Sequence, residues 1–384
     1  MSDAGGRSRS SSERARSLGA SGTRSADEYR EEAIRQQADC DRSVESRTHP
    51  SGWEESRVRI AALRNQMRSS LVKRESAVDA VLASIISRTG CVLLGPPGTA
   101  KSLLVRRVAE ACDLRVGAED SNYFEYLLTA HTMPEEVFGP TDIGLLLQKP
   151  PLVQRRTEAR LPHAELAFLD EVFRGGSHIL NTLLTILNER KFHNGRQIEE
   201  VPLVGFIGAA NQEPQSDELN AFFDRFPVRV WVDSVLAGNP TSLVSNARKL
   251  LEADSNRSTP NVGRGTGPSM HDFRKLWAVL RIKMAPEQTS SRQSTPIDQR
   301  LREFTEFFTT IRRDFDLSDR SFVQLWYFGG ALDMIEERDP HLPYPLGGRG
   351  HLLCFNYVSP KQKLLRRLED QVRSIDRRLE TSGA

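Results

Sequence analysis

The chain has 384 residues and a formal net charge of +2, with 38% hydrophobic and 27% charged residues. This is enough for one folded core with a smaller second domain. The balanced charge argues against a strongly basic nucleic-acid platform, so no nucleic-acid partner is expected. No apolar stretch reaches membrane-spanning length, no signal-peptide core follows the first residues, and the four cysteines show no disulfide-like spacing. These features predict a cytoplasmic protein without membrane contact.

Residues 1–55 are rich in Ser, Arg, Gly and Glu and contain almost no large apolar residues, which predicts a disordered N-terminal tail. From Arg57 to Ser87 apolar residues recur at helical spacing, which indicates a helical lead-in to the folded part.

A glycine-rich loop follows the apolar run Cys91 to Leu94 and precedes a segment, Leu103 to Cys112, with helical spacing. A strand, such a turn and a helix in this order form a phosphate-binding loop, because backbone N–H groups and the helix N-terminus surround an anion. Lys101 would contact the β- and γ-phosphates of ATP, and the Ser102 hydroxyl would be a ligand of Mg²⁺. The alternative is a Pro/Gly turn before an ordinary helix, and Ala100 stands where glycine is usual. The candidate ATP-binding residues are Gly95, Pro96, Pro97, Gly98, Thr99, Ala100, Lys101, Ser102 and Leu103.

Two adjacent carboxylates, Asp170 and Glu171, follow the apolar run Leu166 to Leu169. Continuous apolar runs are typical of buried parallel strands, so we expect both carboxylates at the carboxyl end of a strand. Asp170 can hold Mg²⁺ and its water shell, and Glu171 can orient and polarise the attacking water. The alternative is a solvated turn, which the position after a phosphate loop disfavours.

Two further candidates lie next to later strands. A strand predicted from Leu203 to Ala210 ends on Asn211, whose amide could bond both the γ-phosphate and the attacking water, although a lone Asn more often starts a turn. Arg225 precedes the alternating segment Val228 to Val232. It is a candidate arginine finger, which neutralises charge on the γ-phosphate in the transition state; the alternative is a solvated loop arginine.

The C-terminal part of the chain is predicted to be helical. Apolar stripes from Phe273 to Leu280 and from Leu301 to Phe315 predict an α-helical lid over residues 236–340, with a mobile loop near 254–269. Residues 341–384 are predicted to be a loop followed by an amphipathic helix.

Ser318 is a candidate N-cap of another lid helix. Arg320 would then occupy a fixed helix start, a suitable mount for a second arginine that closes over the nucleotide. Spacing alone does not distinguish this role from an exposed helix arginine.

The order of these motifs resembles the MoxR group of AAA+ ATPases, and the sequence between them resembles its RavA branch. The stretches that carry the resemblance are Phe124–Thr129, Pro134–Pro140, Phe168–Glu171, Asn181–Arg190 and Phe223–Arg225. Family members also carry alanine before the loop lysine. The resemblance implies an α/β fold: an AAA+ P-loop core with a parallel sheet over residues 56–235, followed by a small α-helical lid.

The resemblance also assigns roles. It implies that Asn211 is the first sensor, that Arg225 is the finger acting on a neighbouring subunit, and that Arg320 is the second sensor. Lys101, Ser102, Asp170 and Glu171 match the two Walker motifs. The adenine would lie beside the backbone near Val72 and Arg74.

Two hairpins are expected. In the resembling family a hairpin between Thr129 and Pro162 faces the central pore of a ring. This chain departs from the family pattern there, because it carries the run Leu145 to Leu147 and has Ala159 where glycine is usual. A second hairpin is predicted from Lys191 to Ile198, because the pair Asn194-Gly195 favours a type I′ turn.

These observations lead to one main hypothesis: a Mg²⁺-dependent ATPase that assembles as a hexameric ring and couples ATP hydrolysis to remodelling or chaperone-like maturation of a protein client. By resemblance, its partner would be a von Willebrand A-type protein. Two alternatives remain, a nucleic-acid motor of a restriction or defence system and a nucleotide-gated scaffold.

Overall fold

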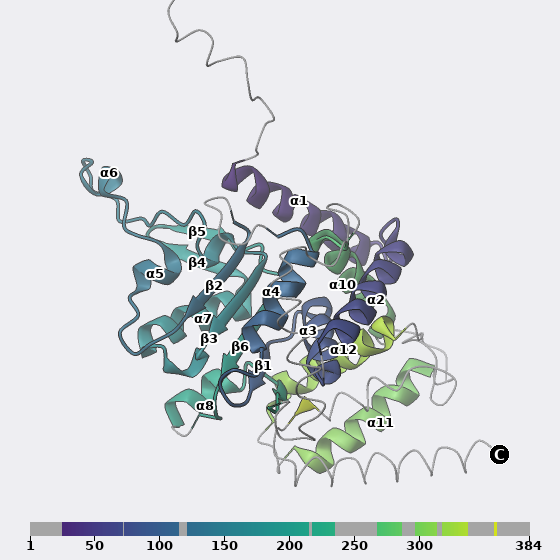
Figure 1. Ribbon diagram of the computed structural model, residues 1–384. Helices are drawn as coiled ribbons and strands as arrows, with labels where there is room; N and C mark the ends of the chain where they lie inside the picture. Colours follow the sequence, from purple (N-terminus) through teal and green to yellow (C-terminus); the bar gives the residue numbers. More distant parts are fainter. Residues whose placement is uncertain are drawn as a thin grey trace, which may run out of the picture.

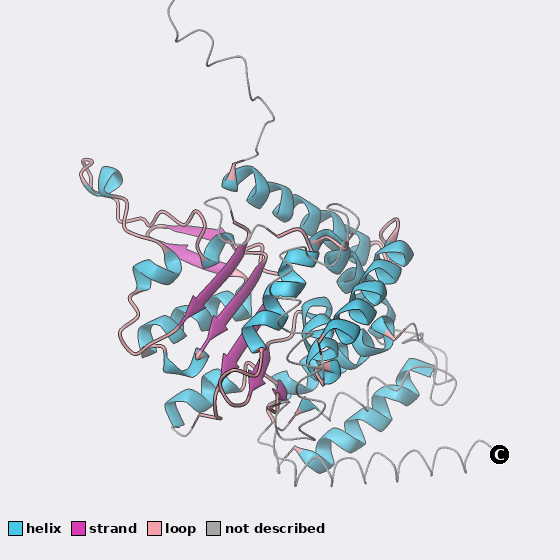
Figure 2. Cartoon of the chain, in the orientation of Figure 1, coloured by secondary structure: helices cyan, strands magenta, loops and turns pink. Residues whose placement is uncertain are grey.

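A five-stranded parallel sheet forms the centre of the computed structural model, with helices on both faces (Figures 1 and 2). The structure describes residues 25–71, 73–114, 121–214, 217–234, 267–285, 296–312, 317–336 and 357–358. Across the sheet the strands lie in the order β2 (Tyr123–Leu127), β3 (Leu166–Asp170), β6 (Gly205–Ala210), β1 (Cys91–Leu94) and β7 (Val228–Trp231). Because every neighbouring pair is parallel, all five strands end at one edge of the sheet.

The sequence of β1 shows why the sheet is covered on both sides. All four of its residues are buried, and Cys91 and Leu93 belong to one apolar cluster, while Val92 and Leu94 belong to another. Successive side chains of a strand point to opposite faces, so an uninterrupted apolar run requires two covering layers.

One layer contains α2 (Trp53–Ser70), α3 (Glu75–Ser87), α4 (Lys101–Ala111) and the C-terminal helices. The approach of α3 is close at Gly205 in β6, where a Cβ atom would lie 2.8 Å from Cγ1 of Ile85. The other layer contains α5 (Pro134–Phe138), α7 (Ser177–Glu189) and α8 (Asp217–Phe223).

The C-terminal helices are α10 (Met270–Met284), α11 (Pro296–Ile311) and α12 (Asp319–Ile335). Their apolar stripes are buried as predicted: Phe304 packs against Phe322 and Trp326 with ring centroids 5.1 and 5.2 Å apart. The buried Arg274 of α10 pairs with Glu165 of the core at 2.6 Å, so the helical part is tied to the sheet. The predicted C-terminal helix and most of the predicted mobile loop lie outside the described residues.

The predicted disordered tail is wrong for residues 25–55. Helix α1 (Ala26–Glu45) starts with a capping box between Ser25 and Glu28, buries Ala33 and Cys40, and packs against α10. The sparse apolar residues fall on one narrow face that a neighbouring helix covers, which composition alone does not reveal. Residues 1–24 lie outside the described part of the chain.

Both expected hairpins are present as local structure. Strands β4 (Lys191–Asn194) and β5 (Gln197–Glu200) pair antiparallel. The predicted type I′ turn is wrong by one residue: the loop is Gly195-Arg196, and only Gly195 has a positive φ, 64°, as a type II′ turn requires.

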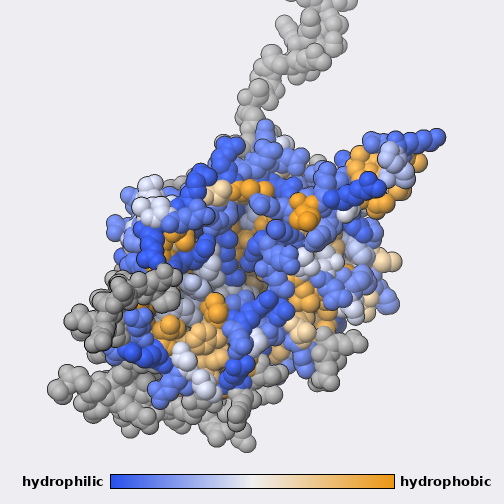
Figure 3. Space-filling view, turned by 180° about the vertical axis from the view of Figure 1, so that it is seen from behind, coloured by the Kyte–Doolittle hydropathy of each residue, from blue (hydrophilic) through white to orange (hydrophobic). Residues whose placement is uncertain are grey.

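The other hairpin is the projection formed by residues 139–155. It contains the short helix α6 (Ile143–Leu146) and is closed by an antiparallel bridge between Thr141 and Arg155. Ile143, Leu147 and Val153 are exposed on it, and Figure 3 shows apolar surface on this projection.

No helix among the described residues combines the length and the apolar character that crossing a bilayer would need.

Candidate active site

The phosphate loop lies between β1 and α4, and its backbone bends three times through the left-handed region. Positive φ angles occur at Gly95 (148°), Gly98 (75°) and Ala100 (64°). At Gly95 a Cβ atom would lie 2.3 Å from the carbonyl oxygen of Val232, so only glycine fits there. Ala100 is the N-cap of α4 and occupies a conformation that costs an L-residue about 1 kcal/mol. The loop therefore keeps its bend although glycine is missing at that position.

Lys101 arches back over this loop. Its Nζ donates to the carbonyl oxygen of Gly95 at 2.7 Å and to that of Pro96 at 3.0 Å. Burial lowers the pKa of the Lys101 ammonium below its ordinary value, and the charges of Asp170 and Glu171 oppose this shift. The ammonium is thus held at the mouth of the loop, where it can turn from carbonyl oxygens to phosphate oxygens.

Ser102 and Asp170 meet beside the loop. The Ser102 hydroxyl donates to Oδ2 of Asp170 at 3.3 Å, which brings one residue from the start of α4 to the last residue of β3. Hydroxyl and carboxylate oxygens are the ligands that Mg²⁺ prefers. This ion commonly binds to few protein ligands, together with substrate phosphates and water. The residue pair therefore fits a Mg²⁺ ion.

Glu171 and Asn211 form the next pair. The Asn211 amide donates to Oε1 of Glu171, and the Glu171 backbone adopts a left-handed conformation (φ 51°) that its own N–H stabilises by donating to Oδ1 of Asp170 at 3.0 Å. Because β3, β6 and β1 are adjacent, these four predicted residues and the phosphate loop gather at one edge of the sheet.

Arg174 was missed by the sequence reasoning. It lies one turn after Glu171 and forms an ion pair with that carboxylate, with Nε 3.3 Å from Oε2. The three-residue spacing could have indicated it.

Arg74 links the loop to the strand at the edge of the sheet. Its Nε donates to the carbonyl oxygen of Thr99 at 3.0 Å and its Nη2 to that of Asp233 at 2.8 Å. The resemblance singled out only its backbone, and Val72 lies outside the described residues.

Arg225 lies at the opposite edge of the sheet. It precedes β7, and Gly90, which precedes β1, packs so closely that a Cβ atom would lie 2.2 Å from the Arg225 carbonyl oxygen. Since β1 and β7 run parallel and the phosphate loop follows β1, the four residues of this strand separate the two sites. At about 3.3 Å per residue this amounts to about 13 Å.

Arg320 lies at the same edge as Arg225. Its Nη1 donates to Oδ1 of Asn188 at the end of α7, and both arginines line a cavity of about 250 Å³. The structure thus places Arg320 beside Arg225 rather than beside Lys101, and its role as the arginine that closes over the nucleotide stays a prediction. The helix start at Ser318 is confirmed, since its hydroxyl accepts from the Ser321 N–H.

Asp224 links the turn before β7 to the start of α12 and was not singled out by the sequence reasoning. Its carboxylate accepts hydrogen bonds from Arg225 (2.9 Å), Ser318 (3.0 Å) and Ser321 (3.2 Å). Burial and the charge of Arg320 lower the pKa of the Arg225 guanidinium, while Asp224 opposes the shift. Asp224 thus holds the turn that carries Arg225 against the helix that carries Arg320.

A parallel sheet with a phosphate loop after β1, adjacent carboxylates after β3 and a polar side chain after β6 defines a P-loop ATPase of the AAA+ class. Residues 58–264, more than half of the chain, match the family described as the MoxR domain in the MoxR-vWA-beta-propeller ternary systems. The chain belongs to this MoxR family.

Relatives cover part of the chain. The uncharacterized protein MJ0079 of Methanocaldococcus jannaschii is 44% identical over 196 residues, which are 51% of this chain and 48% of that protein. MJ0812 of the same organism is 45% identical over 170 residues, 44% of this chain and 43% of that protein. The structural protein ORF618 of Acidianus two-tailed virus is 29% identical over 198 residues, 50% of this chain and 31% of that protein. The match thus spans slightly less than half the length of the two archaeal relatives.

Among solved structures, the crystal structure of a candidate ATPase from Cytophaga hutchinsonii superposes with a TM-score of 0.58 at 15% sequence identity, covering 88% of this chain and 97% of the other. At this identity the likeness establishes the fold alone.

Proposed function

We propose that this chain is a Mg²⁺-dependent ATP hydrolase that works as a ring of identical subunits and couples hydrolysis to remodelling of a protein client. The observation that carries the proposal is the contact between Asn211 and Glu171 beside the Ser102–Asp170 pair. A general base, a polar water-positioning group and a cation-binding pair stand together where the γ-phosphate of ATP held by the loop would lie.

Each residue has a defined task in this proposal. Lys101 leaves the loop carbonyls and neutralises the β- and γ-phosphates, while the loop N–H groups hold their other oxygens. Mg²⁺ bound to Ser102 and Asp170 would neutralise further charge on the same phosphates. Glu171 accepts a proton from the attacking water, and Asn211 keeps both the carboxylate and the water in line with the γ-phosphate.

The ring follows from the two arginines. Arg225 and Arg320 stand at the edge of the sheet that faces away from their own phosphate loop, so within one chain they have no nucleotide to act on. In a head-to-tail assembly the same edge meets the loop of the next copy, and a closed assembly of this kind is a ring. Both arginines would then stabilise the γ-phosphate bound to the neighbour, and a hexamer is the ring size that we propose.

The partner is proposed from the family. Its description couples the MoxR domain with vWA and beta-propeller proteins, so we propose a von Willebrand A-type partner for this chain. Membership of the RavA branch and a cytoplasmic location remain predictions.

The test compares binding with turnover in two variants. Glu171→Gln removes the base but leaves Lys101 and Asp170, so we expect unchanged ATP affinity and phosphate release slower by about 10²- to 10⁴-fold. Lys101→Ala should instead abolish the rise in melting temperature that ATP gives the wild type, since only a bound ligand stabilises the fold. Glu110→Gln, which removes an exposed carboxylate from α4, is the matched control and should behave as the wild type.

ATP binding without turnover in the wild type would point to a nucleotide-gated scaffold instead. Phosphate release by Glu171→Gln at the wild-type rate would contradict the assignment of the base.

A further inference from the structure

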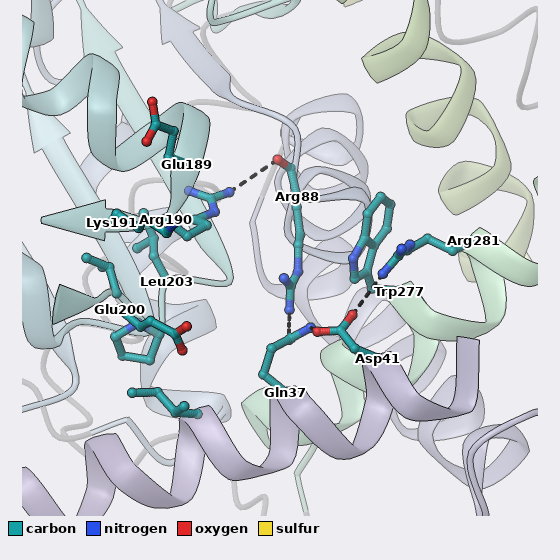
Figure 4. Close-up of a pocket in the computed structure, with 13 residues that line it drawn as sticks. Gln37, Asp41, Arg88, Glu189, Arg190, Lys191, Glu200, Leu203, Trp277 and Arg281 are labelled. Atoms are coloured by element: carbon teal, nitrogen blue, oxygen red, sulfur yellow. Dashed lines mark hydrogen bonds and ion pairs between the residues drawn. The ribbon is translucent and has the colours of Figure 1, made fainter. Parts of the chain in front are cut away.

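A second cavity, of about 270 Å³, lies between the end of α7, the β4–β5 hairpin, α1 and α10 (Figure 4). It is separate from the phosphate loop, because Arg88, one of its lining residues, precedes β1 rather than following it. Two of its walls, α1 and α10, fall outside residues 58–264, the part that matches the MoxR family. The cavity therefore includes elements outside the residues that match the family.

Two arginines face this cavity from fixed backbone positions. Arg88 is the C-cap of α3 and Arg190 the C-cap of α7, with φ angles of 55° and 56°. Arg190 donates through Nη2 to the Arg88 carbonyl oxygen at 3.4 Å, and the Arg88 side chain runs along the cavity to donate to Gln37 of α1 (Figure 4). The two guanidinium groups are thus brought to one site by the ends of two helices.

Neither guanidinium is fully satisfied. Arg88 Nε and Arg190 Nη1 are buried nitrogen atoms without a hydrogen-bond partner, and no ion pair joins either arginine to a carboxylate within the part of the chain that the structure describes. Buried polar groups left unpaired cost free energy, and buried charges are ordinarily paired. The site therefore has N–H groups available for an acceptor that carries negative charge.

The charge balance supports the same conclusion. Burial, together with the charges of Arg190 and Arg274, lowers the pKa of Arg88 to about 9, and burial lowers that of Arg190 to about 10. Both cations are thus held in surroundings that disfavour their charge, which an anion between them would relieve.

Three carboxylates line the cavity, Asp41, Glu189 and Glu200, and none forms an ion pair with either arginine in the described part of the chain, although the charge of Asp41 partly opposes the lowering of the Arg88 pKa. Asp41 of α1 pairs with Arg281 of α10 at 2.8 Å, and the Trp277 ring lies between Arg281 and Arg88, 6.0 and 5.9 Å from their guanidinium carbons. Glu200 points toward the cavity from β5 in Figure 4, with no ion pair to either arginine. Removing the Glu200 charge should make the site more attractive to an anion.

We propose that this cavity binds a small phosphate-bearing anion through Arg88 and Arg190. Guanidinium forks match phosphate oxygens in pairs, and the cavity volume accommodates inorganic phosphate or a small phosphate monoester. The bound anion touches the core through both arginines and lies against α1 and α10, so it fastens the N-terminal helix and the lid to the ATPase core.

The test uses the full chain carrying Lys101→Ala, which keeps phosphate away from the nucleotide loop. Inorganic phosphate and glycerol 3-phosphate are titrated separately, with calorimetry for affinity and melting temperature for stabilisation. We expect saturable binding, and the tighter of the two probes identifies free phosphate or a phosphate monoester as the source. Arg88→Gln and Arg190→Gln should each weaken binding at least about tenfold, because each removes charge-assisted hydrogen bonds.

Two further variants test whether the measured phosphate binding occurs at this cavity. Glu200→Gln alters an exposed hairpin residue and should tighten binding, which tests the proposal even if an arginine variant does not fold. Arg196→Gln is the matched control: it removes an exposed arginine of the β4–β5 turn that lines neither cavity, and it should leave the affinity unchanged. No saturable binding, or equal loss in Arg196→Gln and Arg88→Gln, would overturn the proposal.

Discussion

The two edges of the central sheet differ in how their charges are matched. At the carboxyl edge, cationic and anionic groups are both present: Lys101 bonds to loop carbonyls, and the carboxylates of Asp170 and Glu171 accept from Ser102 and Asn211. A nucleotide arriving there exchanges existing hydrogen bonds for new ones. In the proposed function this edge supplies the groups for nucleotide binding and for water activation.

At the amino edge the cations outnumber the anions. Arg225 pairs with Asp224, Arg320 donates to Asn188, and the cavity beside them is lined by four arginines and by no acidic residue among the described ones. The carboxyl edge is therefore complete within the chain, whereas the amino edge is arranged for negative charge supplied from outside it. In the proposed ring that charge would be the γ-phosphate bound to the neighbouring subunit.

Among these variants, Arg225→Ala is expected to cause the largest loss of ATPase activity. Arginine fingers contribute on the order of 10³-fold or more to the rate, so phosphate release should fall by that factor while ATP affinity stays at the wild-type value. Arg320→Ala should reproduce the defect, because the second arginine faces the same cavity. Steady-state phosphate release and ATP titration measure the two quantities, with Arg196→Ala, an exposed arginine of the β4–β5 turn, as control. If ATP affinity fell with the rate, the amino edge would not be independent of the carboxyl edge.

Asp224→Asn should give an intermediate effect. The amide keeps the shape and one acceptor oxygen but loses the charge that holds Arg225 and the start of α12 together, so we expect kcat to fall about tenfold with KM unchanged. A purely structural role would instead lower the melting temperature without this split between kcat and KM, and that result would remove Asp224 from the account of the site.

Ala100→Gly should give the smallest effect. Glycine relieves the left-handed strain at φ 64° but adds entropy to the unfolded chain, so the free energy of unfolding should rise by at most about 1 kcal/mol, with unchanged ATPase activity. Denaturant unfolding provides the measurement. A large gain in activity would show that alanine in the loop impairs the wild-type site.

The carboxyl edge could be predicted from the sequence, and its residues are brought together as expected. Each of its motifs directly follows a strand: Lys101 and Ser102 come after β1, Asp170 ends β3, and Asn211 follows β6. In a parallel sheet the strand ends converge, so local sequence suffices to place them.

The position of Arg320 could not be predicted in this way. It depends on how α12 packs against α3 and on the hydrogen bonds of Asp224, which are contacts between segments far apart in the sequence. Helix α1 escaped prediction for a related reason, since its stability comes from packing on α10 rather than from its own apolar content. Tertiary packing decides such cases, and composition does not record it.

In the proposed ring, the two edges of one subunit serve two different nucleotides. Lys101→Ala destroys the phosphate site and keeps the arginines, whereas Arg225→Ala keeps the phosphate site and destroys the finger. Mixing the two inactive variants, once light scattering has shown that both assemble and exchange subunits, creates interfaces where an intact loop meets an intact arginine. We predict steady-state phosphate release in the mixture well above the average of the separate variants. Release no greater than that average, despite subunit exchange, would contradict the claim and return Arg225 to its own subunit or to a structural role.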